Sequence, residues 1–362
     1  MEKVLEASDR ISDVNFSVGR PPQVEIDGVL KPVPVFGLQR LSAFQTETIA
    51  LHILRGDPEK TRILVGTGSS DVSYAIPGKT RFRVNIFQQR GTYAIVLRVI
   101  PSGIPTIDQL GLPGEVKEIA DLKNGIVLVT GPTGSGKSTT LAAIINRINE
   151  EKAYHIVTVE DPIEYLHPHK ECTVNQREVG TDTKSFALAL RAALRQAPKV
   201  ILIGEMRDME TIETALEAAE TGHLVLSTLH TIDAAKTVER IMGVFPKAQE
   251  QFIRRRFAAT FRSVISQRLI PRREGGRIAA LEILKSTQRT RDYVLKGEGE
   301  GRSLLDAMKD GDMEGMQTFD GVLEHYIREG WITYEDGLLY ATNETNLRLG
   351  LADLPDSVKE GQ

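Results

Sequence analysis

The 362-residue chain has a single cysteine, Cys172, so it can form neither an intramolecular disulfide nor a zinc site built from several cysteines. No apolar run approaches the about 18 residues that a membrane-spanning helix needs, and Met1–Glu6 lacks the apolar core of a signal peptide. Lys and Arg number 45 against 49 Asp and Glu, and this net charge of −4 gives no general reason to expect nucleic-acid binding. These absences fit a globular cytoplasmic protein.

The one local excess of positive charge lies in the second half of the chain, where Arg254-Arg255-Arg256 is followed by Arg262 and Arg268. We interpret this run as a solvated helix face rather than a nucleic-acid surface. In an oligomer such arginines could also pair with carboxylates of a neighbouring subunit.

The first hundred residues predict a small α/β domain. Alternating residues indicate strands at 71–76, 80–86 and 91–99, and Val24–Gly28 reads as a strand that ends in an Asp-Gly hairpin turn. Helical spacing extends from Leu41 to about Arg55, and Ser42 with Gln45 can form its capping box. Prolines and glycines then cluster over 101–114, which marks a linker.

From Glu115 onward, apolar strands alternate with helical segments, which predicts a mostly parallel sheet covered by helices. Strands are expected at 125–130, 154–160, 200–205, 224–229 and 277–284. Helices are expected at 185–196, 209–220 and 249–269, and again, joined by short loops, over 286–352. We expect the last ten or so residues to be frayed.

A complete phosphate-binding loop of the G-x-x-x-x-G-K-[ST] type follows the strand at 125–130. Its residues are Gly131, Pro132, Thr133, Gly134, Ser135, Gly136, Lys137, Ser138 and Thr139. The glycines let successive backbone N–H groups surround an anion at a helix N-terminus, where negative charge is favoured. Lys137 is expected to reach the β- and γ-phosphates and the Ser138 hydroxyl to ligate Mg²⁺. The loop therefore predicts binding of a nucleoside triphosphate, with ATP and Mg²⁺ as the cofactors.

Acidic residues follow two later strands, at the end where a parallel sheet presents its ligands. The strand at 154–160 runs into Glu160, Asp161 and Glu164, and the strand at 200–203 is followed by Gly204 and Glu205. Gly204 occupies the place where many ATPases carry a metal-binding aspartate, so Glu205 must serve the Mg²⁺ ion, the attacking water or both. Glu205, Glu160 and Glu164 are all candidates for activating water, and the residues alone do not choose among them.

Two histidines bracket the strand at 224–229. His223 precedes it, and His230 follows it beside Thr228 and Thr231. A histidine at a strand end is often a structural hydrogen-bonding residue. His230 could instead sense the γ-phosphate and change position after hydrolysis, so both histidines are catalytic candidates.

With these motifs in this order, the chain resembles the secretion-ATPase superfamily, in particular the PilT/PilU twitching-motility ATPases. The resemblance extends from about Ser12 to about Leu351 and includes four boxes, at 131–139, 156–166, 200–205 and 221–231. It implies α/β architecture with a PAS-like N-terminal domain at 1–98, a linker at 99–115 and a RecA-like ATPase core at 116–285. A helical C-terminal region at 286–352 and a tail at 353–362 complete this expected division.

The resemblance also implies a ring of six subunits in the cytoplasm, at the inner face of the inner membrane. ATP hydrolysis there would drive pilus retraction, with an inner-membrane platform protein as partner and membrane association only through partners. Nucleotide in such rings sits between domains, and N-terminal arginines complete the site. Arg81, Arg83 and Arg98 occupy the corresponding region and are the candidate arginine fingers, which would neutralise charge on the transferring phosphoryl group.

Two departures bear on the type of motor. Assembly ATPases of the superfamily carry a zinc-binding tetracysteine and a long extra N-terminal region, and both are missing here, which favours retraction. The segment at 287–297 matches poorly the motif that PilT proteins carry after the core, so an accessory, PilU-like motor beside a paralogous ATPase is also open. An ATPase of a conjugative or type IV secretion system, and a ring subunit that binds ATP with little turnover, are the alternative functions.

Overall fold

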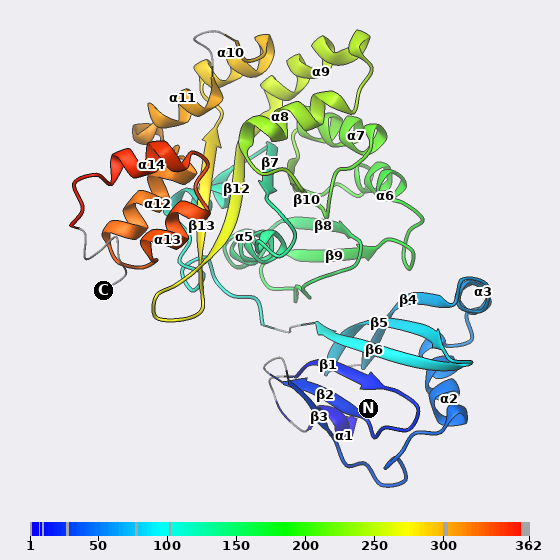
Figure 1. Cartoon of the computed structure of the whole chain (residues 1–362). Coiled ribbons are helices and arrows are strands. Elements are labelled where there is room, and N and C mark those ends of the chain that lie inside the picture. The colour runs from blue at the N-terminus through cyan, green and yellow to red at the C-terminus, as the bar shows by residue number, and fades with distance from the viewer. Residues whose placement is uncertain are drawn as a thin grey trace. The chain divides into compact units, whose positions relative to one another are not determined.

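The computed structural model describes residues 2–6, 8, 11–26, 29–76, 79–100, 103–299 and 303–355 (Figure 1). The chain divides into two compact units, one made of residues 1–103 with 164–166 and the other of 104–163 with 167–362. The finer division into linker, core, helical region and tail stays a prediction. Each unit is α/β, as the sequence predicts.

The N-terminal unit is a six-stranded antiparallel sheet with helices packed on it, in the order β3-β2-β1-β6-β5-β4. Its elements are α1 (Glu2–Leu5), β1 (Ile11–Phe16), β2 (Gln23–Ile26), β3 (Val29–Pro32), α2 (Ala43–Leu54), α3 (Pro58–Thr67), β4 (Ser69–Ile76), β5 (Thr80–Gln89) and β6 (Thr92–Ile100). The predicted capping box is confirmed, because Ser42 and Gln45 each bond the backbone N–H of the other at the start of α2. β2 pairs antiparallel with β3, while the expected turn residues Asp27 and Gly28 lie outside the described residues.

The C-terminal unit is built on a seven-stranded sheet in the order β13-β12-β7-β11-β10-β8-β9. All neighbouring strands are parallel except β12 and β13. The strands are β7 (Gly125–Thr130), β8 (His155–Glu160), β9 (Thr173–Glu178), β10 (Val200–Ile203), β11 (Leu224–Leu229), β12 (Phe261–Pro271) and β13 (Arg277–Lys285). The helices are α4 (Gly114–Glu118), η1 (Ile119–Asp121), α5 (Lys137–Glu151), α6 (Phe186–Ala193), α7 (Met209–Glu220), α8 (Ala234–Gly243), α9 (Lys247–Thr260), α10 (Gln288–Lys296), α11 (Leu304–Lys309), η2 (Asp312–Glu314), α12 (Phe319–Arg328), α13 (Tyr334–Leu339) and α14 (Glu344–Gly350).

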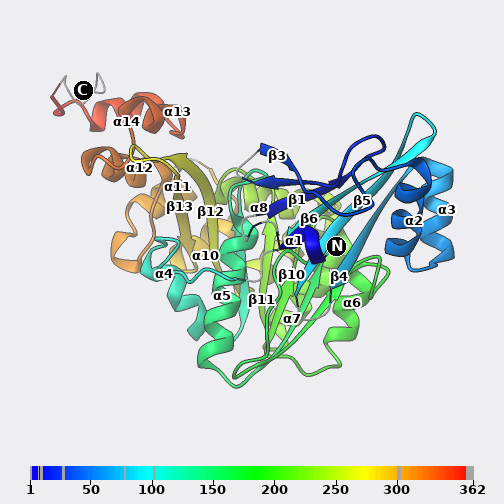
Figure 2. The ribbon, with the colours of Figure 1, turned by 90° about the horizontal axis from the view of Figure 1, so that it is seen from below.

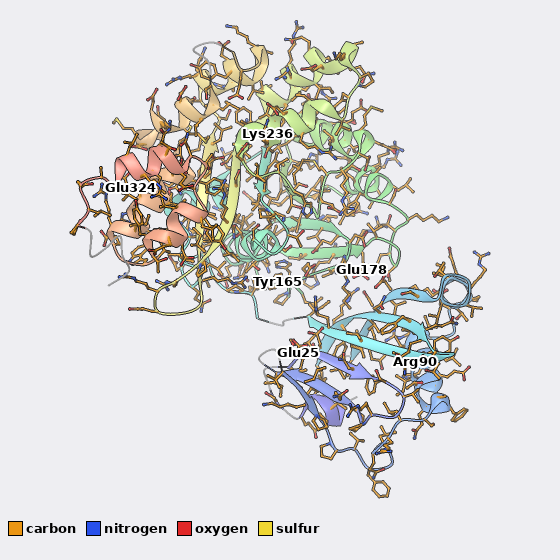
Figure 3. All side chains as sticks on the ribbon, in the orientation of Figure 1. Glu25, Arg90, Tyr165, Glu178, Lys236 and Glu324 are labelled. Atoms are coloured by element: carbon orange, nitrogen blue, oxygen red, sulfur yellow. The ribbon has the colours of Figure 1, made fainter. Side chains whose placement is uncertain are left out.

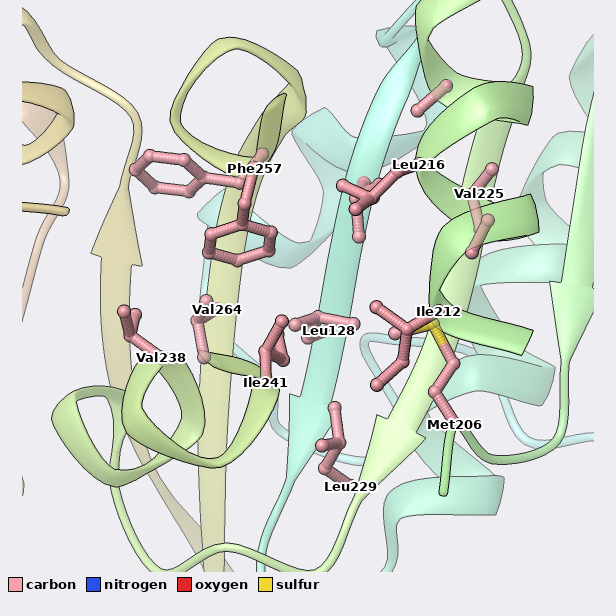
Figure 4. Close-up of a cluster of buried hydrophobic side chains, with 14 of the residues drawn as sticks. Leu128, Met206, Ile212, Leu216, Val225, Leu229, Val238, Ile241, Phe257 and Val264 are labelled. Carbon is pink, nitrogen blue, oxygen red and sulfur yellow. The ribbon is translucent and has the colours of Figure 1, made fainter. Parts of the chain in front are cut away.

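Helices cover both faces of this sheet (Figure 2). On one face Leu128 and Ile201 pack with the helices α6 to α9, and on the other Val127 and Leu202 pack with α4 and α5. Figure 4 shows Leu128 on the first face, among side chains of α7, α8 and α9. Neighbouring residues of one strand thus belong to different cores, which is why β7, β10 and β11 are buried at every position and read as continuous apolar runs. This two-sided burial fixes the strand ends that carry the candidate site.

The predicted helix over 249–269 is wrong in its second half. α9 ends at Thr260, and the chain continues directly into β12, which lies between β7 and β13. Phe261, Val264 and Ile265 have the spacing of a helix face, and the short apolar run allowed either reading. Pairing with a strand on each side decides for the extended form. This strand pairing joins segments that are far apart in the sequence, so it cannot be predicted from the spacing of apolar residues within 261–269.

The arginine run is used within the chain. Arg254 pairs with Glu250 on α9, and Arg256 makes a two-nitrogen contact with Glu220 of α7, both nitrogens at 2.7 Å from a carboxylate oxygen. Arg262 donates to the Asn124 side chain, and Arg268 stacks on the Phe319 ring at 3.7 Å from its centroid. The interpretation as a solvated helix face is wrong for these four arginines, because the Arg254 and Arg256 side chains are only 17% and 18% exposed and Arg262 and Arg268 lie on β12.

Candidate active site

The phosphate loop connects the end of β7 to the start of α5, as predicted. Gly131, Gly134 and Gly136 have φ values of 142°, 79° and 89°, which residues with a side chain rarely adopt. The loop therefore requires glycine at these positions whether or not a nucleotide is bound.

Lys137, the first residue of α5, is 8% exposed and folds back over the loop. Its Nζ donates to the carbonyl oxygens of Gly131 and Pro132, each at 2.9 Å. Burial lowers the pKa of its ammonium group, and attraction to the Glu205 carboxylate opposes that shift. A buried cation bonded only to carbonyls has no anion in direct contact, so a phosphate group is a more favourable partner for it. Ser138 is exposed at the next position, where its hydroxyl can face a ligand.

Glu205 follows β10 and brings the third and fourth sequence boxes together. Its Oε2 atom lies 2.6 Å from Arg207 Nε and 3.4 Å from His230 Nε2. The backbone around it is fixed from β11, because the Thr228 hydroxyl donates to the Gly204 carbonyl at 2.6 Å. The Glu205 side chain is only 15% exposed. The structure thus brings His230 to Glu205, and it adds Arg207, which is not among the predicted site residues.

Glu160 ends β8, next to β10, and is buried. Its Oε1 atom accepts hydrogen bonds from the Thr158 hydroxyl at 2.6 Å and from the Gln176 amide at 3.2 Å. Glu178 lies opposite it at the end of β9 (Figure 3) and accepts the Ile163 backbone N–H at 3.2 Å. Glu160 is therefore held inside the strand-end layer, whereas Glu205 is partly exposed.

Gly204 is explained by the spacing between β10 and β8. A Cβ atom at this position would lie 3.3 Å from Glu160 Cα and 3.4 Å from the Val159 carbonyl oxygen. The Gly204 N–H also donates to that carbonyl at 2.7 Å. A larger residue here would push β8 and β10 apart, so the close packing of two carboxylate-bearing strands depends on glycine.

The structure does not bring His223 to this site. His223 precedes β11, and the register pairs Leu224 with Gly125, so His223 lies at the edge of the sheet opposite the phosphate loop. Its Nδ1 atom is 2.8 Å from the Ala218 carbonyl at the end of α7, a helix-capping contact. The two histidines lie at opposite ends of β11, so only His230 is at the edge of the sheet where the phosphate loop lies.

Four other candidates belong to the N-terminal unit. Arg81 and Arg83 on β5 and Arg98 on β6 share one face of its sheet, since Arg83 and Arg98 are direct cross-strand partners. Arg98 also pairs with Asp13 at 3.0 Å. Glu164 is exposed and falls with this unit in the division of the chain. The site described in the C-terminal unit therefore does not include these residues.

Two features beside the loop were not foreseen. The Gln267 side chain of β12 bonds the loop at Ser135 and the first turn of α5 at Thr140. A cavity of about 460 Å³ adjoins the loop residues 132–135 and is bounded by Arg268, Leu269 and Tyr340. Gln267 and this cavity lie on or beside β12, which the sequence predicted to be helical. Their only signal in the sequence is the presence of polar and aromatic residue types.

Among the residues that the structure describes, no group of three or more His, Cys, Asp and Glu side chains is arranged to hold a metal ion. Mg²⁺ commonly takes one or two protein oxygens and completes its shell with water and substrate phosphates. The Ser138 hydroxyl and the Glu205 carboxylate fit that pattern.

In the described part of the chain no helix is both long and apolar enough to cross a membrane.

A RecA-like parallel sheet with a phosphate loop after β7 and a carboxylate after β10 defines a P-loop ATPase. The family model described as "Type II/IV secretion system protein" matches residues 69–301, and the chain belongs to this family.

Pilus ATPases and secretion ATPases are both among the similar proteins; the solved structures include the ATPase DotB of Legionella pneumophila, with a TM-score of 0.81 at 31% identity over 94% of each chain. The chain is 43% identical to the "Type IV pilus retractation ATPase PilT" of Pseudomonas aeruginosa over 92% of this chain and 94% of that protein. It is 40% identical to the "Type IV pilus ATPase PilU" of the same organism, over 93% of this chain and 87% of that protein. The crystal structure of the pilus retraction motor PilT with bound ADP superposes with a TM-score of 0.86 at 44% identity, covering 96% of this chain and 98% of that one. The chain is accordingly an ATPase that uses adenine nucleotide.

Proposed function

We propose that this chain hydrolyses ATP to power retraction of a type IV pilus. The observation that carries the proposal is the meeting of Lys137, Glu205 and His230 at one edge of the sheet, in a chain similar over nearly its whole length to PilT and PilU. Twitching motility is the cellular behaviour that such retraction would produce.

In this proposal the loop amides and Lys137 bind the phosphates, and the nucleoside half enters the cavity beside residues 132–135. Ser138 and Glu205 would hold Mg²⁺, which neutralises charge on the phosphate oxygens. Glu205 orients and deprotonates the attacking water. It is better placed for this than Glu160, because Thr158 and Gln176 already hold the Glu160 carboxylate within the strand ends.

His230 and Arg207 both contact the same oxygen of Glu205. They therefore orient the carboxylate before nucleotide arrives, and His230 connects it to the start of α8 at Ala234 through only three intervening residues. A change at the γ-phosphate that moves Glu205 would move His230 as well, which is the phosphate-sensing role assigned to it.

We further propose that the chain acts as a homohexamer in the cytoplasm, at the inner face of the inner membrane, bound there through a platform protein. Arg81, Arg83 and Arg98 would complete the nucleotide sites of the ring as arginine fingers. Their position on one face of a sheet supports a shared role, since they can approach one anionic ligand from one direction. PilT and PilU are similar to the chain to nearly the same degree, so the proposal covers both the principal and the accessory motor.

Two experiments test the proposal. The purified wild-type chain is expected to turn over ATP at steady state, and the Lys137→Ala variant is expected to lose this turnover. Equal turnover in the wild-type chain and in Lys137→Ala would contradict a hydrolytic role for this loop. Deletion of the gene is expected to leave surface pili that extend and do not shorten if the chain is the principal motor, and pili that shorten more slowly if it is the accessory motor. Normal retraction together with lost secretion or conjugation would favour the secretion-system alternative, and negligible wild-type turnover would favour the accessory ring subunit.

A further inference from the structure

Gln267 is a buried polar residue on β12. Its side chain does not bond Lys137, Ser138 or Glu205, the residues with a role in the proposed reaction. It is 3% exposed, and both ends of its amide are used. Nε2 donates to the Ser135 carbonyl oxygen at 2.6 Å, and Oε1 accepts from the Thr140 hydroxyl at 2.7 Å. One side chain thus joins the phosphate loop to the first turn of α5.

The bond to Ser135 fixes the direction of a peptide group in the loop. In a trans peptide the C=O and the next N–H point in opposite directions. When Gln267 holds the Ser135 carbonyl toward β12, the Gly136 N–H must point away from β12, toward the hollow of the loop. Such inward N–H groups are what an anion-binding loop offers to phosphate oxygens.

Two of the loop glycines are in contact distance of the same residue. A Cβ on Gly136 would lie 2.7 Å from Gln267 Nε2, and a Cβ on Gly131 would lie 2.4 Å from the Gln267 carbonyl oxygen. Real Cβ atoms do not approach other heavy atoms this closely. β12 therefore lies directly against the loop, and the glycines make room for Gln267 as well as for a nucleotide.

The Ser135 hydroxyl gives an independent indication of what the loop is arranged for. It is buried and has no hydrogen-bond partner among the described residues. A buried hydroxyl without a partner costs free energy unless a ligand or water satisfies it. The backbone carbonyl of Ser135 accepts the hydrogen bond from Gln267. This bond therefore orients the Gly136 N–H and also restricts the position of the Ser135 hydroxyl.

We propose that Gln267 is a positioning residue for nucleotide binding, which holds the phosphate loop in its anion-binding conformation before ATP arrives. The proposal rests on the nucleotide binding proposed above. Preorganisation lowers the cost of ordering the loop on binding. Removal of the anchor is therefore expected to weaken nucleotide affinity more than it slows the chemical step.

The variants separate the two ends of the amide. Gln267→Met keeps the length of the side chain and removes both bonds, and Gln267→Glu keeps the acceptor for Thr140 but places an oxygen against the Ser135 carbonyl. Thr140→Val removes only the bond to α5. Gln317→Met is the matched control, since the Gln317 amide donates to the Leu281 backbone carbonyl of the same sheet at 2.7 Å without contacting the loop.

ADP affinity by isothermal titration calorimetry, the KM and kcat for ATP, and the thermal midpoint without nucleotide are measured for each protein. Gln267→Met and Gln267→Glu are expected to raise the ADP Kd and the KM by on the order of tenfold, with kcat changed far less. Gln317→Met is expected to bind ADP like the wild-type chain, and Thr140→Val to retain most of the affinity that Gln267→Met loses.

The outcomes distinguish the two proposals. Wild-type ADP affinity in both Gln267 variants, with only a lower thermal midpoint, would overturn the positioning role and leave Gln267 as a packing residue. If Gln267→Met does not fold, the ADP affinities of Gln267→Glu and Thr140→Val decide. A weaker affinity in Gln267→Glu than in Thr140→Val supports the positioning role, and equal affinities overturn it. A wild-type chain that binds no ADP would overturn the proposed function, and the role of Gln267 with it.

Discussion

Glu282 on β13 offers a quantitative test of the structure, because a carboxyl group is buried there without a full ion pair. It is 2% exposed, and its Oε1 atom accepts the Ala234 N–H at the start of α8 at 2.8 Å. Burial raises the pKa of Glu282 from its ordinary 4.5 to about 7, and the nearby Asp233 adds to the rise. The hydrogen bonds from Ala234 and Ser266 and the charge of Arg268 lower it only in part.

The direction of the pH dependence follows from the raised pKa. The folded protein binds the Glu282 proton more tightly than the unfolded chain does, so its contribution to stability is fully present below the unfolded pKa. It is lost as the pH rises through the folded pKa near 7. A pKa difference of this size corresponds to about 3 kcal/mol. The variant Glu282→Gln carries no proton to lose, and its amide oxygen can still accept from Ala234.

We predict that the unfolding free energy of Glu282→Gln, relative to the wild-type chain, rises by about 3 kcal/mol between pH 4 and pH 8.5. Urea unfolding followed by tryptophan fluorescence measures it, because the only tryptophan, Trp331, lies in the C-terminal unit with Glu282. Glu329→Gln, an exposed change in the same unit, is the control and should show no such trend. A difference between Glu282→Gln and wild type that stays constant with pH would refute the burial of an uncompensated carboxyl group.

Two further predictions concern the site and the fold. Glu205→Gln is expected to bind ATP like the wild-type chain and to lose turnover by on the order of a hundredfold or more, since the amide cannot accept a proton from water; undiminished steady-state turnover would remove Glu205 from the chemistry. Burial lowers the pKa of His167 to about 4, so the folded state binds fewer protons than the unfolded chain between pH 6.5 and 4. The unfolding free energy should therefore fall by about 3 kcal/mol as the pH drops through that range, and His167→Gln should abolish this part of the loss in the same fluorescence assay.

The sequence predicted the parts of the site whose signals are local. The phosphate loop is recognisable because strand, glycines, lysine and helix follow one another without interruption. Glu205 and His230 were found because each directly follows an apolar strand, and parallel strands present these ends together. The predicted strands at 125–130 and 224–229 agree with β7 and β11.

The parts that sequence reasoning missed depend on pairing between distant segments. Gln267 acts on the loop only because β12 lies beside β7, and the apolar spacing over 261–265 equally suited a helix. His223 belongs to the same sequence box as His230, but it precedes β11 and His230 follows it, so the two side chains lie at opposite ends of the strand. Arg207 has no local signal, since an exposed arginine after a strand is ordinary until a structure shows the carboxylate that it contacts.

We propose above that ATP hydrolysis at Glu205 drives pilus retraction. Time-lapse imaging of labelled pili provides the test, in a deletion strain that carries either the wild-type or the Glu205→Gln gene at matched protein levels. We expect the wild-type gene to restore shortening of extended pili and the Glu205→Gln gene to leave them extended. Shortening at wild-type speed in the Glu205→Gln strain would contradict the claim.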